Sequence, residues 1–522
     1  MLGPDALTIQ VQTEVEENLV EDQEKRNVPA WAWVLGCLGL LAACAVVVGL
    51  GAALAAIFVV TSASEEAGLP TDFLAEATVV AESTDLDVPE LTIAPTTPAP
   101  DTAEPEPTPV PSEAAPESAE SAAVEGQAAQ AEADDPFAAA RADIETRVAS
   151  IRRLEPKEPV EPVSLTRNEL RQRVEGEFLA DYGPQEARRD AIALSAFDFM
   201  PADFELHTLI LELLTEQVLG YYDTVSDEFV IISDDDQFDT LEQLTHAHEY
   251  VHALQDQHYN LDILDDETLD SEALFAAQAM VEGEATFVQN LFMLGGYFEL
   301  GQLLELVGDV LTVDMAVLES APPVLAHELE FPYLSGVEFV QALYEQGGFQ
   351  AIDAAWNNMP QSTEQILHPQ RYLDGDAPQL VTLAPLTDTL GAGWSLVEED
   401  VLGEFYLREY LAQQLENDLV DQAATGWGGD RYAVYWHEAS QAPVLVLKLA
   451  WDTPADADEF ADIYPMYAGQ MFGVEPSPQD SGMCWSGEDI ICFYSAGGES
   501  LVVRTPDMPT AAKVAVAQNI GG

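Results

Sequence analysis

Positive charge is scarce in this chain of 522 residues. Lysine and arginine together number 18, whereas aspartate and glutamate number 94, and the formal net charge is −76. Proteins that bind nucleic acid usually carry a basic surface that contacts the phosphates. The composition therefore excludes nucleic acid as an expected partner. Hydrophobic residues still make up 48% of the chain, so a large core can be buried.

Cysteine is also rare, and its four copies fall into two pairs. Cys37 and Cys44 lie in a long apolar run near the start. Cys484 and Cys492 lie in two short apolar segments on either side of residues 486–489, "SGED", and this pattern predicts a β-hairpin. Opposed cysteines in a hairpin either form a disulfide in an oxidising compartment or stay as two buried thiols. We expect the disulfide.

A long early stretch contains no charge at all. Residues 31–60 are uncharged over all 30 positions, and about 20 apolar residues suffice to span a bilayer. Lys25 and Arg26 precede this run, and no lysine or arginine follows it before Arg141. Because positive residues favour the cytoplasmic side, we expect residues 1–30 to be a cytoplasmic tail and residues 31–60 a single helix in the cell membrane. The rest of the chain would then be extracytoplasmic.

The next stretch lacks aromatic residues. None occurs between residues 74 and 136, and the sequence there is rich in proline, alanine, glutamate and threonine. Such a composition cannot bury enough apolar surface to fold, and proline with self-repelling acid keeps a chain extended. The sequence therefore predicts a disordered stalk over residues 61–135.

From residue 136 the composition becomes that of a folded protein. We expect an α+β, mostly helical fold with one domain over residues 136–375 and a C-terminal α+β region over residues 376–522 packed on it. Apolar residues alternate around a turn in residues 220–233, which predicts a β-hairpin or edge strand. Long helices are predicted over residues 241–257 and 271–296.

Histidine is also scarce, yet four of the eight copies lie within residues 244–260. His248 and His252 are four positions apart, so they share one face of the predicted helix, and paired imidazoles suit a tetrahedral zinc ion. Glu249 lies about 100° around the helix and could take a proton from a metal-bound water without ligating the metal. His246 points to the opposite side. The spacing predicts a Zn²⁺ site.

A zinc site needs a third protein ligand, and the segment "VEGEAT" at residues 281–286 offers two acids. Glu282 shares a helix face with small residues that permit close approach, whereas Glu284 lies in an apolar stripe where a carboxylate needs a partner. One would ligate the metal and the other would brace a ligand; we favour Glu282 as the ligand. Asp256, one turn after His252, either orients that histidine or is a solvated acid.

These motifs carry a resemblance. Residues 248–252, "HEYVH", followed by residues 282–285, "EGEA", resemble the HExxH and EGxA motifs of the gluzincin zinc metallopeptidases. The wider layout, roughly residues 160–460, resembles bacterial peptidase-MA-like proteins. The resemblance implies a zincin-like catalytic domain in which a hairpin precedes the active-site helix. The matching segments are "GYYD" (220–223), "HEYVHALQDQHYNL" (248–261), "VEGEAT" (281–286), "FPYLSG" (331–336), "STEQILHPQRY" (362–372) and "GWGGDRY" (426–432).

Zincins often add a proton donor that stabilises the oxyanion of the reaction. Candidates for this catalytic role are His368 and Tyr372, with Tyr333 as a weaker one. Each could equally be a buried polar residue that bonds to the backbone. "WGGDRY" is interpreted as a structural turn in which Asp430 and Arg431 make local contacts.

The sequence thus favours a membrane-anchored, extracytoplasmic zinc-dependent peptidase that acts on a peptide or protein substrate. The alternative is a non-catalytic cell-surface binding protein on a zincin-like fold. Glu249 favours the enzyme, because a structural zinc site uses a fourth protein ligand and needs no base.

Overall fold

A computed structural model describes residues 136–519, apart from residues 161, 181, 217, 225, 227, 234–236, 267, 311–314, 480 and 481. The predicted tail, membrane helix and stalk, residues 1–30, 31–60 and 61–135, lie outside the described residues. Within the described part of the chain, no helix is long and apolar enough to cross a membrane.

Helices dominate the first part of the described chain, up to about residue 390. A small sheet accompanies them in the strand order β1-β3-β2, with β1 parallel to β3 and β2 antiparallel to it. The strands are β1 (Pro162–Leu165), β2 (Gly220–Asp223) and β3 (Glu228–Ile232). The helices are α6 (Ala138–Arg152), α7 (Arg167–Arg173), α8 (Pro184–Ser195), α9 (Leu206–Glu216), α10 (Thr240–Tyr259), α11 (Ser271–Phe292), α12 (Leu300–Val310), α13 (Ala316–Ser320), α14 (Pro323–Gly347), α15 (Phe349–Trp356), α16 (Thr363–Leu367), α17 (Pro369–Asp374) and α18 (Thr387–Leu390).

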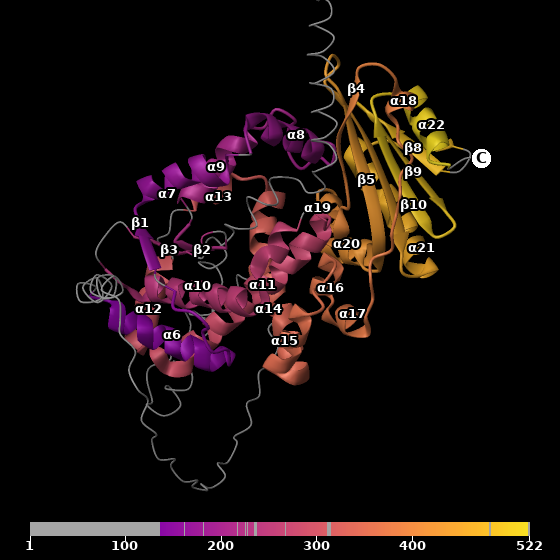
Figure 1. Ribbon diagram of the computed structural model, residues 1–522. Helices are drawn as coiled ribbons and strands as arrows, with labels where there is room; N and C mark the ends of the chain where they lie inside the picture. The colour runs from indigo at the N-terminus through magenta and orange to yellow at the C-terminus, as the bar shows by residue number, and fades with distance from the viewer. Residues whose placement is uncertain are drawn as a thin grey trace, which may run out of the picture. The chain divides into compact units, whose positions relative to one another are not determined.

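The second part of the chain is built on a seven-stranded antiparallel sheet with the order β4-β5-β6-β10-β9-β8-β7 (Figure 1). Its strands are β4 (Trp394–Asp400), β5 (Trp427–His437), β6 (Ala442–Trp451), β7 (Ser477–Gln479), β8 (Gly482–Ser486), β9 (Ile490–Ala496) and β10 (Glu499–Thr505). Its helices are α19 (Gly403–Ala412), α20 (Asn417–Ala424), α21 (Pro454–Phe472) and α22 (Met508–Ala517).

This sheet corrects the predicted fold class. The expectation of a mostly helical α+β fold is wrong, because the described chain mixes helices with a seven-stranded antiparallel sheet. No described helix could span a membrane, and the predicted one over residues 31–60 lies outside the described residues. The segment "WGGDRY" is no isolated turn but the start of β5, a central strand. Its two glycines and its charged pair concealed the strand. Asp430 is buried and accepts backbone hydrogen bonds from Leu402 and Gly403.

Both faces of the large sheet are covered by helices. Alternate residues of β5, β6, β9 and β10 point to opposite faces, as strand geometry requires. The residues on one face pack against α21. Those on the other face pack against α22, together with Leu390 of α18 and Leu386 just before that helix. Figure 1 shows α18 and α22 on the outer side of the sheet. The predicted hairpin is β8 and β9, in which Cys484 lies opposite Cys492 and forms a disulfide with it.

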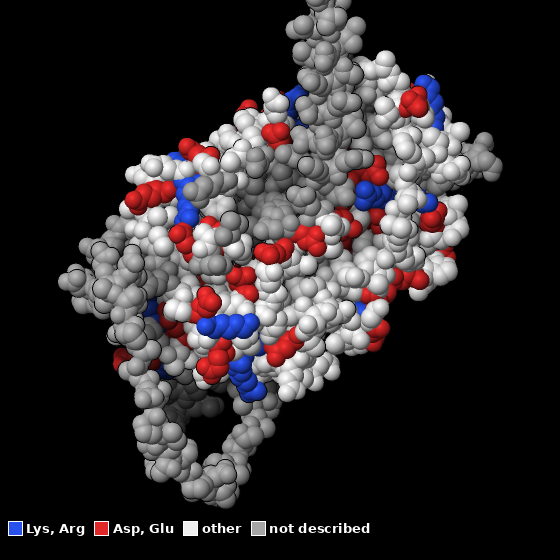
Figure 2. All heavy atoms as spheres, in the orientation of Figure 1, with Lys and Arg blue, Asp and Glu red and all other residues white. Residues whose placement is uncertain are grey.

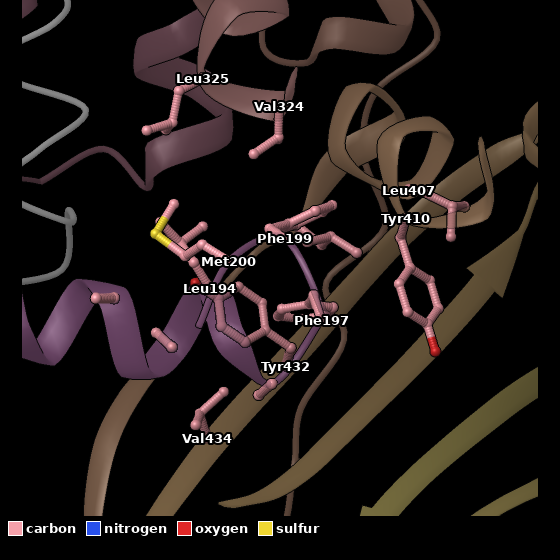
Figure 3. Packing of buried hydrophobic residues seen from close by; sticks show 14 of the residues in the cluster. Leu194, Phe197, Phe199, Met200, Val324, Leu325, Leu407, Tyr410, Tyr432 and Val434 are labelled. Atoms are coloured by element: carbon pink, nitrogen blue, oxygen red, sulfur yellow. The ribbon is translucent and has the colours of Figure 1, made fainter. Parts of the chain in front are cut away.

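The core of the sheet continues into the helices. Phe197, just after α8, packs edge-on against Tyr432 of β5 and Tyr410 of α19, with ring centroids 5.3 and 5.7 Å apart. Figure 3 shows these rings with Phe199 and with Val324 of α14 in the same buried cluster. A separate cluster lies among α10, α11, α14 and α15. The two parts of the chain are therefore joined by apolar packing. The histidine-rich helix α10 belongs to the separate cluster with α11, α14 and α15.

Acidic side chains are spread over the face of the molecule seen in Figure 2, with fewer basic ones among them. Several basic groups pair with acids, as in Arg173 with Glu228 at 2.6 Å and Lys448 with Glu499 at 3.0 Å. Exposed pairs of this kind contribute little to stability. Among the described residues on this face, no broad basic patch that could contact phosphates is visible.

Candidate metal centre

Two adjacent helices form the candidate site. Helix α10 begins at a capping box, in which Asp239 accepts from the backbone N–H of Glu242 and the Glu242 side chain accepts from Asp239. Helix α11 begins at Asp270, whose side chain accepts from the Ala273 N–H. These caps set where each helix starts, and therefore which side chains face the neighbouring helix.

Three side chains converge between α10 and α11. Nε2 of His248 lies 3.2 Å from Oε2 of Glu282, and Nε2 of His252 lies 3.4 Å from the same oxygen. Each residue offers one atom that could ligate a metal, and these three atoms lie within 4.8 Å of one another. All three residues are buried. The two imidazole rings face the same side of α10, with centroids 4.8 Å apart. The structure therefore brings together His248, His252 and Glu282, the residues predicted as ligands.

The chemistry of this donor set fits a zinc ion. Two imidazole nitrogens and one carboxylate are a ligand set that catalytic zinc sites use. Nε2 of His252 is buried, and apart from Oε2 of Glu282 at 3.4 Å, too poorly aligned for a hydrogen bond, it has no partner among the described residues. A buried polar atom without a partner is costly, and a cation between His252 and Glu282 would satisfy it.

The electrostatics of the three groups also favour a cation. Burial raises the pKa of Glu282, but the charge of His252 and the contacts with both histidines outweigh burial and lower this pKa to about 2. Burial lowers the pKa of His252, but the charge of Glu282 reverses the effect and raises this pKa to about 9. Burial lowers the pKa of His248. Glu282 therefore stays ionised and attracts positive charge to the space that it shares with the histidines.

Glu249 lies next to the three ligands without belonging to their set. It is fully buried. Burial raises the pKa of Glu249 to about 8; the charge of Glu282 adds to the rise, while His252 and the backbone of Tyr222 oppose it. A carboxylate with such a pKa accepts a proton readily near neutral pH, which is what a general base requires.

The hairpin of β2 and β3 packs directly against α10 at Glu249. Gly220, the first residue of β2, makes this possible: a Cβ atom there would lie 2.9 Å from Cγ2 of Thr245 and 3.4 Å from Cγ of Glu249. The predicted hairpin before the histidine-rich helix is thus present, and glycine at position 220 lets it approach the helix closely.

Glu284, the second acid of residues 281–286, accepts hydrogen bonds on both of its carboxylate oxygens. Its Oε2 accepts from Nε2 of Gln255 at 3.0 Å and from Nε1 of Trp356 at 2.7 Å, and its Oε1 accepts from Nε of Arg152. Glu282 rather than Glu284 faces the histidines. Glu284 instead reaches His252 through Gln255, whose Oε1 lies 2.8 Å from Nδ1 of His252.

Asp256 does not have the role predicted for it. Its carboxylate accepts from the hydroxyl of Tyr222 at 3.0 Å and from the backbone N–H of Leu261 at 2.9 Å. It ties the end of α10 to β2 and to the following turn. Gln255, one residue earlier, contacts His252 instead, because a residue three positions on from His252 shares its helix face.

His368 and Tyr372 also lie apart from the three ligands. Nε2 of His368 lies 3.0 Å from Oε1 of Glu404, and the hydroxyl of Tyr372 donates to the backbone oxygen of Asn358 at 2.8 Å. Each is satisfied locally, and among the described residues neither contacts the histidines. Tyr333 of α14 does: its buried ring lies 6.2 Å from that of His248, centroid to centroid. Of the three proposed proton donors, the structure places Tyr333 at the site.

His246 faces away from the candidate ligands, as expected. Its Nε2 lies 3.0 Å from Oε1 of Glu145 on α6, and its ring packs on Phe229 of β3 with centroids 4.8 Å apart. This histidine joins α6 and the small sheet to the back of α10 and has a structural role.

A second group of acids lies elsewhere in the described chain. Carboxylate oxygens of Glu364, Asp376 and Asp452 come within 4.8 Å of one another. The guanidinium of Arg371 already pairs with Asp376 at 2.8 Å and with Asp452. The positive charge that these acids attract is thus supplied by the chain itself, and the group is an ion-pair network.

Two contributors to the centre are absent from the sequence-based prediction. Gln255 lies three residues after His252 on the same helix face, but Asp256, one position on, shares that face, so helix periodicity could not single out Gln255. Arg152 carried no such signal. It is 1% exposed and reaches Glu284 from α6, 132 positions away in sequence.

Comparison with known proteins finds a match only for the part of the chain that contains the large sheet. A family model described as a domain of unknown function (DUF8575) matches residues 393–515, which run from β4 through most of α22. No curated protein and no solved structure matches the chain. The matched segment contains none of the candidate ligands, so the interpretation of the metal centre depends on its own geometry.

Proposed function

We propose that this chain is a zinc-dependent peptidase in which His248, His252 and Glu282 hold the ion and Glu249 is the general base. The observation that carries the proposal is the convergence of two imidazoles and one carboxylate, with a buried glutamate beside them that is not a ligand. Catalytic zinc sites use three protein ligands, whereas structural sites use four. The resemblance of the two motifs to gluzincins supports the peptide bond as the target.

The roles of the residues follow from their positions. A bound zinc ion would supply a Lewis acid for the scissile carbonyl and would acidify a water molecule. Glu249 would accept the proton of the attacking water on its carboxylate and return it to the leaving amine, in keeping with its raised pKa of about 8. Tyr333, whose ring lies beside that of His248, would donate a hydrogen bond to the substrate oxygen.

The compartment stays a prediction. The Cys484–Cys492 disulfide is typical of proteins outside the reducing cytoplasm. This agrees with an extracytoplasmic peptidase.

The test is zinc content measured together with cleavage. The purified full-length chain, His252→Ala and Glu249→Gln would be analysed for bound metal and then incubated with a peptide library read by mass spectrometry. We expect about one zinc per chain in the native protein and in Glu249→Gln, little in His252→Ala, and cleavage by the native protein alone. Glu249→Gln is the matched control, because it keeps all three ligands.

Two other outcomes would overturn the proposal. If the chain takes up no zinc, the metal centre is absent. If zinc is bound by the three ligands but no peptide is cleaved, the non-catalytic binding protein becomes the better interpretation.

A further inference from the structure

The side-chain amide of Gln255 has a defined orientation. Its Nε2 lies 3.0 Å from the backbone oxygen of Val281 and 3.0 Å from Oε2 of Glu284. Backbone and carboxylate oxygens only accept hydrogen bonds, so the NH₂ group must face them. The amide oxygen is therefore the atom that faces Nδ1 of His252, at 2.8 Å. The opposite amide orientation would set oxygen against two oxygens and lose both hydrogen bonds.

This orientation determines which nitrogen of His252 can bind a metal. An amide oxygen cannot donate, so Nδ1 of His252 must carry the hydrogen that joins them. The lone pair of the neutral ring then lies on Nε2, the atom that faces Glu282 at 3.4 Å. In the other tautomer, a hydrogen on Nε2 would occupy the direction of the metal. Gln255 thus holds His252 in its metal-binding form.

Gln255 is itself held by Glu284, which Arg152 and Trp356 fix in turn. Glu284 is fully buried and accepts one N–H from each of these two residues in addition to that of Gln255. Arg152 is also buried; it bonds to Asp353 at 2.7 Å and lies over the ring of Phe349, 5.0 Å from its centroid. A buried carboxylate needs a counterion, and Arg152 provides it from α6.

We propose that Gln255 is a positioning residue that keeps His252 in the tautomer that binds the metal, and that Arg152 and Glu284 hold Gln255 in place. This inference rests on the proposed zinc site and deepens it. It makes helix α6 part of the metal centre, although α6 contributes no ligand.

The experiment measures zinc affinity in the full-length chain by competition with a chromogenic chelator. Gln255→Leu removes the acceptor of the His252 hydrogen, and we expect zinc affinity to fall about 10- to 100-fold, as is usual when a group that orients a ligand is lost. Gln365→Leu is the matched control, because Gln365 is also a buried glutamine with hydrogen bonds but lies on α16. Both variants should lower the melting temperature, and only Gln255→Leu should weaken zinc binding.

A second variant tests the hydrogen bonds that hold Gln255. Gln255→Glu keeps an oxygen for Nδ1 of His252, but it sets a carboxylate oxygen against Glu284 and against the backbone oxygen of Val281, where the native amide donates. Oxygens that only accept cannot bond to one another, so we expect the side chain to lose its position and zinc affinity to fall.

Three results would overturn the inference. These are zinc binding by Gln255→Leu as tight as that of the native chain, an equal loss of affinity in Gln365→Leu, and zinc binding by Gln255→Glu as tight as that of the native chain. In each case the native chain still binds zinc and the proposed function survives. If the native chain itself binds no zinc, the proposed function fails and this inference falls with it.

Discussion

Gly283 of α11 lies against Gly336 of α14 so closely that a Cβ atom on Gly283 would overlap the backbone carbonyl of Gly336. A Cβ atom on Gly336 would likewise overlap the backbone oxygen of Ala279. The two helices therefore cross in backbone contact. Glu282 directly precedes one glycine, and Tyr333 lies three residues before the other. The crossing thus sets the distance from α14 to the metal centre.

Replacing either glycine should destabilise the protein. We expect Gly283→Ala or Gly336→Ala to cost about 1–3 kcal/mol or more in free energy of unfolding, because an extra methyl group in a tightly packed contact forces the helices apart. Urea denaturation would measure it. Gly301→Ala on α12 is the control: nothing lies within 4 Å of the added atom, so the variant should be neutral or more stable by up to about 1 kcal/mol. Equal effects at the three positions would contradict the packing argument.

The disulfide between Cys484 and Cys492 should stabilise the large sheet. It closes a loop with a sequence separation of 8, and the entropy of such a loop in the unfolded chain corresponds to about 2–3 kcal/mol. We expect the double variant Cys484→Ala with Cys492→Ala to lose about this much free energy of unfolding.

A reducing agent provides the control for that variant. It should lower the denaturation midpoint of the native protein and leave the double variant unchanged. A midpoint that is the same for the native protein and the variant under oxidising conditions would show that the hairpin gains nothing from the bond.

The sequence predicted the parts of the site that depend on one helix or on adjacent segments. Two histidines four positions apart must share a helix face whatever surrounds them, and the carboxylate beside small residues, Glu282, is the one that faces them. Asp256 and Gln255 are both within one turn of His252, so helix periodicity alone could not choose between them. His368 and Tyr372 had the right chemistry, but their partners, Glu404 and the backbone of Asn358, are defined only by the fold.

The large sheet was underestimated for a related reason. Its central strands β5 and β6 are buried on both faces, so they show no clean alternation of polar and apolar residues, and short apolar runs are ambiguous between helix and strand. Only their pairing, with Asp430 opposite Leu449 and Ala433 opposite Val446, makes them a sheet. Arg152 is a comparable case, because its burial depends on contacts with Glu284 of α11 and Phe349 of α15.

Glu364 should make stability depend on pH. It is 3% exposed. Burial, together with the charges of Asp452 and Glu404, raises the pKa of Glu364 to about 9. A group whose pKa is higher in the folded state binds its proton more tightly there, so its contribution is complete below the unfolded value near 4.5 and is lost as pH rises toward 9. Glu364→Gln, which mimics the neutral acid, should lose less stability than the native protein between pH 5 and pH 9.

Urea denaturation at pH 5, 7 and 9 would measure this difference. Glu475→Gln serves as the control, since Glu475 is exposed and its substitution removes the same charge. The control and the native protein should change in parallel. If Glu364→Gln also changes in parallel with them, Glu364 is ionised in the folded protein and Arg371 neutralises it.

Removal of the metal should lower thermal stability through the candidate ligands alone. A ligand that binds only the folded state at 1,000 times its Kd stabilises that state by about 4 kcal/mol. Without the ion, the carboxylate of Glu282 and Nε2 of the two histidines face one another in a buried site. We therefore expect EDTA to lower the melting temperature of the zinc-loaded chain by several degrees and added zinc to restore it, whereas His252→Ala should respond to neither. If EDTA destabilised His252→Ala as much as the native chain, the chelated ion would lie elsewhere. Loss of that response in Glu364→Gln would then identify the acids around Arg371 as the site.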